Sequence, residues 1–182
     1  IRWVRERANI RFDESGNALS AVGTVQDITE RREAEEQLRK LSLAMEQSPH
    51  SIIITNTQAE IEYVNEAFVR NTGYTRDEVI GRNPRLLNPG TLEAAPPAEL
   101  WTTLQRGEVW HGEFINRRKD GSIFEEMAII SPVRQPDGRI THYLAIKEDI
   151  TEKKRIQSEL ETYRQHLEQL VDERTEELMR AK

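Results

Sequence analysis

The chain of 182 residues is 32% charged and 36% hydrophobic, and its net charge of −6 without a basic stripe argues against a nucleic-acid partner. The absence of cysteine excludes disulfides and thiolate metal sites, and the four histidines are scattered without a metal-like cluster. Because no apolar run approaches the ~20 residues that cross a bilayer, we expect a cytoplasmic chain, or the cytoplasmic part of a membrane-anchored parent.

The first 28 residues predict a β-hairpin. Two strand-like runs, 3–12 and 18–28, flank the turn sequence Asp13-Glu14-Ser15-Gly16-Asn17, in which glycine and asparagine can adopt a positive φ. Two strands alone are marginally stable in water, so the hairpin is expected to pack on another structure.

Residues 29–48 predict an amphipathic linker helix. Thr29 occupies the position of an N-cap, with Asp27 two residues before it, and Pro49 ends the helix. The apolar or small side chains between them follow a 4-3-4-3 spacing, which indicates a narrow seam. They are Ala34, Leu38, Leu41, Met45 and Ser48.

Residues 49–150 predict one complete domain of strands and short helices. Asn65 is expected to cap one short helix and Thr75 a second, while Pro96 and Pro97 are expected to start a third that ends before Gly107. Strands are predicted at 51–55, 61–64, 108–118, 123–133 and 140–150.

Residues 151–182 predict a second helix with a dimerisation seam. Thr151 occupies the N-cap position, and apolar side chains follow with the 4-3-4-3 spacing of a coiled coil. A helix of this length extends ~48 Å at 1.5 Å per residue, which is too long for a small domain to bury. We therefore expect a homodimer through parallel helices. The seam residues are Ile156, Leu160, Tyr163, Leu167 and Leu170.

A long internal repeat relates the two hairpin–helix segments. Asp27 and Thr29 return 122 residues later as Asp149 and Thr151, in the same register as the sequences upstream of them. A period of this length is a domain plus its connecting helix, because solenoid repeats span about 20–50 residues. We therefore divide the chain into 1–28 (the last two strands of a preceding module), 29–48 (linker helix), 49–150 (complete module) and 151–182 (outgoing helix).

The order of motifs in residues 42–151 resembles the PAS family. The resemblance implies an α+β fold, in which short helices cover one face of a five-stranded antiparallel sheet and form a pocket, here flanked by long N- and C-terminal helices. It also implies a sensory module of a bacterial multi-domain signalling protein, with Asp27, Thr29, Asp149 and Thr151 as relay positions. The motifs are Tyr63-Val64-Asn65-Glu66-Ala67-Phe68, Thr72-Gly73-Tyr74, Gly81-Arg82-Asn83, Asn116-Arg117-Arg118-Lys119-Asp120-Gly121 and Asp149-Ile150-Thr151.

Within this family, the chain is most similar to flavin-binding sensors. Light-oxygen-voltage domains use a cysteine where this chain has Pro84, so their photoadduct chemistry is impossible here. In FAD-containing redox sensors of nitrogen fixation and methane oxidation, a Trp and an Asn stand fifteen residues apart, as Trp101 and Asn116 do. However, Glu126 and Lys147 occupy the places of the amides that hold the flavin edge, and Pro84 replaces an acidic residue of the nitrogen-fixation sensor. We therefore expect a colourless protein without a cofactor, with FAD or FMN as the alternative.

The candidate cofactor-binding residues are Asn83, Trp101, Asn116, Glu126 and Lys147, and each also has a structural interpretation. Trp101 is more typical of core packing than of a cofactor stack, and either asparagine can serve to bond nearby backbone. Glu126 and Lys147 are expected to be exposed or to pair with each other, because burying unpaired charge is costly.

Three functions are compatible with these residues. A sensor of a small molecule would relay its signal to an output domain in the same chain, of histidine kinase or GGDEF (diguanylate cyclase) type. A ligand-free dimerisation spacer would fill its pocket with Trp101, Phe114, Met127 and Leu144. An enzyme would need a catalytic constellation or a glycine-rich phosphate loop, and the sequence contains neither, so we expect no catalytic and no metal-binding residues.

Overall fold

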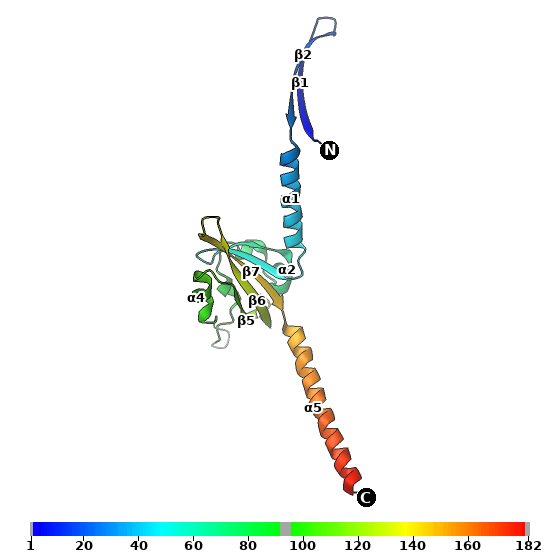
Figure 1. The fold of residues 1–182 in the computed structure, drawn as a ribbon, viewed down its shortest axis with the longest axis vertical. Helices are drawn as coiled ribbons and strands as arrows, with labels where there is room; N and C mark the ends of the chain where they lie inside the picture. The colour runs from blue at the N-terminus through cyan, green and yellow to red at the C-terminus, as the bar shows by residue number, and fades with distance from the viewer. Residues whose placement is uncertain (1, 92–95, 181–182) are drawn as a thin grey trace. The chain divides into compact units, whose positions relative to one another are not determined.

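The chain forms two units, Ile1–Glu46 and Gln47–Lys182. The computed structural model describes residues 2–91 and 96–180, so the extreme ends of the predicted segments 1–28 and 151–182 lie outside the described residues. Figure 1 traces the elements in chain order. No helix among the described residues is long and apolar enough to cross a membrane.

The first unit is a hairpin followed by a helix, as predicted. Strand β1 (Val4–Phe12) pairs antiparallel with β2 (Ala18–Asp27), and α1 covers Thr29–Glu46. No described residue of this unit is buried, although its strands carry several large apolar side chains.

The second unit is built on a five-stranded antiparallel sheet of order β4-β3-β7-β6-β5, which confirms the predicted fold class. The predicted strands are all present, with ends that shift by no more than two residues. They are β3 (Ser51–Asn56), β4 (Ile61–Val64), β5 (Trp110–Arg117), β6 (Ile123–Arg134) and β7 (Ile140–Asp149).

Short helices connect the first two strands to the last three. Asn65 begins α2 as predicted, and its buried Oδ1 accepts the backbone N–H of Phe68 at 3.1 Å and that of Ile52 at 2.9 Å, which ties the helix to β3. The third predicted helix starts at Glu99 rather than at Pro96, with Ala98 at its N-cap. The helices are α2 (Glu66–Thr72), α3 (Arg76–Val79), a 3₁₀ turn η1 (Pro84–Leu87), α4 (Glu99–Gln105) and the outgoing α5 (Thr151–Arg180).

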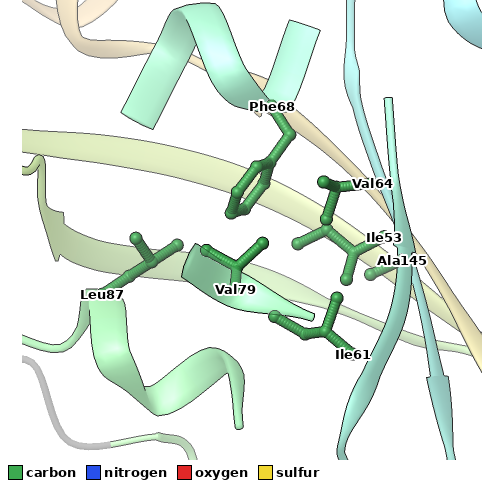
Figure 2. Packing of buried hydrophobic residues seen from close by; sticks show 7 residues of the cluster. All are labelled: Ile53, Ile61, Val64, Phe68, Val79, Leu87 and Ala145. Atoms are coloured by element: carbon green, nitrogen blue, oxygen red, sulfur yellow. The ribbon is translucent and has the colours of Figure 1, made fainter. Parts of the chain in front are cut away.

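Two hydrophobic clusters lie between the helices and the inner face of the sheet. In the first, Phe68 of α2, Val79 of α3 and Leu87 of η1 converge on strand residues, as Figure 2 shows. The second joins Leu100 and Leu104 of α4 to the sheet. The strand residues of the first cluster are Ile53, Ile61, Val64 and Ala145, and those of the second are Trp110, Ala128 and Tyr143.

Candidate ligand pocket and its junction with the outgoing helix

A cavity of about 110 Å³ lies between the two clusters, because α4 and η1 meet the sheet there without filling the space. Its walls are mostly apolar and aromatic, which is typical of small-molecule sites. The apolar wall residues include Ile53, Leu100, Leu104, Phe114, Ile130 and Ala145.

Trp101 lies at the wall of the cavity and also packs against an aromatic residue of the core. Its ring lines the cavity and also packs edge-on against Tyr143, with ring centroids 5.9 Å apart and an interplanar angle of 76°. This T-shaped contact is a favoured aromatic geometry, so the tryptophan is held in place whether or not a ligand is bound.

A buried polar network closes one end of the cavity. The Glu126 carboxylate accepts the Lys147 ammonium at 2.8 Å and the Asn116 amide N–H at 2.6 Å. The three residues are only 1%, 6% and 6% exposed, and Asn116 and Lys147 line the cavity. Of the two arrangements expected for the charged residues, the structure contains mutual pairing. The network links β5, β6 and β7 at the wall of the cavity.

A second polar group lies near η1. The Asn83 side chain accepts the backbone N–H of Arg85 at 3.0 Å, so it bonds its own turn and also lines the cavity. Arg85 lines the same cavity with an exposed side chain, and the sequence analysis did not single it out. The only feature of the sequence that could have indicated this role of Arg85 was its position two residues after Asn83. It gives the cavity a cationic group that is open to solvent.

Met127 and Leu144 do not fill the pocket in the way that a ligand-free spacer would require. Met127 is 38% exposed, and Leu144 alternates along β7 with Tyr143 and Ala145, which line the cavity. Successive strand residues point to opposite faces, so both side chains lie on the outer face of the sheet. Trp101 and Phe114 alone of the four named residues face the cavity.

The junction between β7 and α5 is tied to the sheet by several polar contacts. Asp149 accepts the Thr151 backbone N–H at 3.0 Å, while the Thr151 hydroxyl accepts the Glu125 backbone N–H at 2.9 Å. Thr151 therefore binds its helix to β6 rather than capping that helix, which differs from the role expected for it. Lys154 adds ion pairs of 2.5 Å to both Glu113 and Glu125.

Arg118 connects this junction to the core, although it is not among the predicted site residues. Its guanidinium pairs with Asp149 at 2.6 Å, donates to the backbone carbonyl of Asn71 and lies 4.1 Å from the centroid of the Phe124 ring. Because Arg118 and Asp149 are 31 residues apart, only the register of the strands brings them together.

The hydrogen bonds at the junction control the charge of Asp149. Burial alone would raise the pKa of this carboxyl, but the Arg118 hydrogen bond and the donors of Thr151 together outweigh it and hold the pKa below its ordinary value of 3.8. A carboxyl whose pKa is lower in the folded protein than in the unfolded protein stabilises the fold at any pH above its unfolded-state pKa. This stabilisation is lost as the pH falls through the folded-state pKa.

Substituting Asp149 with alanine is expected to loosen the start of α5. The loss of an acceptor at a helix start costs about 1 kcal/mol, so amides of the first α5 turn should exchange roughly fivefold faster. Hydrogen exchange would measure this, with Glu148→Ala on the opposite face as the matched control. The difference in exchange rate between Asp149→Ala and wild type should be complete well above pH 3.8 and should disappear in stronger acid. A difference that does not change with pH would contradict a role for the charged Asp149 carboxylate.

The sequence model of the PAS domain family matches residues 49–152. The chain belongs to the PAS family. Its modules are sensory rather than catalytic, and membership gives this chain a sensory or regulatory role. Among the described residues, no group of three or more His, Cys, Asp or Glu side chains could hold a metal ion.

Individual proteins show the same relationship. The chain is 38% identical to a nitrogen fixation regulatory protein of Klebsiella oxytoca, over 59% of this chain and 22% of that protein. It is 34% identical to a bacterioopsin transcriptional activator of Halobacterium salinarum, over 76% of this chain and 21% of that protein. The structure of an RNA-binding light-oxygen-voltage receptor aligns with a TM-score of 0.61 and 26% identity, covering 90% of this chain and 44% of the receptor. This chain thus spans about a fifth of the length of these curated relatives.

Proposed function

We propose that the chain senses a small molecule in the cavity and relays its presence through the β7–α5 junction. The observation that carries this proposal is the placement of two networks on the same three strands. The buried network uses one residue from each strand, and the junction network uses a residue two positions away on the same strand or just after it. The pairs are Asn116 and Arg118 at β5, Glu126 and Phe124 on β6, and Lys147 and Asp149 on β7. A change at the cavity therefore acts within two residues of the Arg118–Asp149 ion pair at the start of α5.

The chemistry of the cavity favours a small ring with one polar edge. Aromatic side chains supply the walls, and the Asn116 amide and the Lys147 ammonium supply donors at one end. An engineered apolar cavity of about 150 Å³ binds benzene, so a cavity of about 110 Å³ suits a ligand of one ring. Because ligand sites usually measure about 300–1,000 Å³, a cavity of this size favours a ligand smaller than an isoalloxazine.

A flavin is the second candidate, because Trp101 and Asn116 line one cavity and Arg85 adds an exposed cation to it. Against it, Glu126 already accepts one N–H from Lys147 and one from Asn116, so fewer donors remain for the larger polar edge of a flavin. An edge left without partners loses about 1–3 kcal/mol for each unsatisfied buried group.

Absorbance and native mass spectrometry distinguish these ligands. We expect a colourless protein that carries an added small mass, and Asn116→Ala should lose that mass while Arg117→Ala, on the other face of β5, retains it. A yellow preparation whose flavin bands vanish in Asn116→Ala would make flavin-based sensing the function. A protein without any bound mass, from cells or after incubation with metabolite mixtures, would support the ligand-free spacer instead.

The signal would leave the module through a pair of α5 helices. None of the described α5 residues is buried, and the seam residues Leu160, Tyr163 and Leu167 are 68%, 68% and 60% exposed. A second copy in parallel would cover this seam, and a change at the junction would alter how the two helices cross. The output domain would follow in the same chain, of histidine kinase or diguanylate cyclase type.

A further inference from the structure

The hairpin β1–β2 repeats the geometry of β6–β7 pair by pair. Its nine facing residue pairs coincide, after a shift of 122 residues, with nine pairs of the second hairpin. The register irregularity between Arg11 and Phe12 returns between Val133 and Arg134. The first hairpin thus has the shape of a strand pair that elsewhere in this chain forms part of a five-stranded sheet.

The junction after the hairpin repeats as well. The Thr29 hydroxyl accepts the Trp3 backbone N–H at 2.9 Å, and Asp27 accepts the Thr29 backbone N–H at 2.9 Å. These are the contacts that Thr151 and Asp149 make in the second module. Arg32, which corresponds to Lys154, also contacts its strand, with its guanidinium 5.1 Å from the centroid of the Trp3 ring.

The two faces of the hairpin differ in chemistry. The residues that face the same way as the cavity-lining residues of β6 and β7 are mainly apolar, and the opposite face carries Arg5, Arg7 and Arg11. The apolar side is uncovered among the described residues, with Phe12 59% and Val25 67% exposed. The apolar residues of this face are Val4, Ala8, Ile10, Phe12, Ala21 and Val25.

We propose that a preceding PAS module of the same parent chain covers this apolar face and pairs with both edges of the hairpin. In the second module β5 and β3 occupy the two edges of the β6–β7 pair, whereas in the described part of the chain nothing pairs with the outer edges of β1 and β2. A second copy of the hairpin stacked face to face would bury the side chains but leave both backbone edges open, and open edges invite further pairing. A complete upstream module satisfies the face and the edges together.

The upstream pocket would differ from the second one at its polar end. Val4 and Val25 stand at the positions of Glu126 and Lys147, so the ion pair is replaced by two valines. Glu6, the pairing partner of Val25, stands on this face where the second module has Ala128, so the upstream pocket keeps a carboxylate but has no lysine opposite it. The two modules therefore would not select the same ligand.

Hydrogen exchange in the parent protein tests this proposal. The 182-residue chain is compared with a protein that also carries the preceding stretch of about 100 residues, the length of one small domain. Amides of β1 and β2 should exchange on the order of a hundredfold more slowly in the longer protein. Those of β6 and β7 should be protected equally in both. Val25→Asp, on the apolar face, should abolish the added protection, whereas Thr24→Asp on the opposite face should retain it.

Equal exchange of β1 and β2 in the two proteins would overturn the proposal, and so would equal effects of the two aspartate variants. Protection that arises in the 182-residue chain as its concentration rises would identify a second copy as the occupant instead. The wild-type comparison remains decisive even if Val25→Asp prevents the upstream module from folding.

Discussion

Replacing Lys147 with methionine is expected to lower the free energy of unfolding by about 3–5 kcal/mol. The Lys147 and Glu126 side chains are only 7% and 1% exposed and pair at 2.8 Å. Removing the lysine leaves the glutamate buried without its counter-charge, which is far more costly than the loss of an exposed pair. The midpoint of denaturation by urea, with the slope checked for constancy, gives the change.

Two controls separate the unpaired charge from the loss of packing. The double variant Glu126→Leu/Lys147→Met should recover most of the lost stability, because replacing a buried ion pair by apolar residues is often neutral or stabilising. Lys119→Met, which removes an exposed partner of Glu78, should leave the midpoint nearly unchanged. If Lys147→Met behaved like Lys119→Met, the network would not be buried in solution.

Leu167→Asp is expected to convert a dimer into a monomer. Leu167 is one of the five seam residues of α5, and in a parallel homodimer its substitution places two carboxylates opposite each other. We expect a loss of about 3 kcal/mol or more, which is at least about a hundredfold in the dissociation constant. Light scattering coupled to size-exclusion chromatography measures the mass.

The matched control for this variant is Gln165→Asp, which places the same charge on the side of α5 away from the seam. It should remain dimeric. A wild-type monomer, or a Leu167→Asp dimer of unchanged mass, would show that α5 does not pair through these residues.

Much of the fold could be predicted from the sequence because its strands and helices follow from patterns among residues that are close together in the chain. The strand at 140–150 and the cap at Asn65 depend on neighbours within a few positions, and both agree with the structure. The 122-residue repeat was visible because both junctions use the same Asp and Thr, and their hydrogen bonds coincide.

The candidate site was harder to predict because its contacts cross strands. The carboxylate of Glu126 and the ammonium of Lys147 meet only through the pairing of β6 with β7, and charge in a sequence usually indicates exposure. The pairing of Arg118 with Asp149 was not predicted because the two residues are 31 positions apart in the sequence. Met127 was placed on the wrong face because a shift of one residue reverses every side chain of a strand.

A distance measurement between two α5 helices tests the link from the cavity to the outgoing helix. The chain has no cysteine, so Gln165→Cys offers one site for a spin label in each copy. Double electron–electron resonance is then recorded with the native network and with Glu126→Leu/Lys147→Met, while Lys119→Met serves as the control. We predict that the double variant shifts the distance distribution and that Lys119→Met leaves it unchanged. Superimposable distributions in all three proteins, or no dipolar coupling at all, would contradict a relay from the cavity to paired helices.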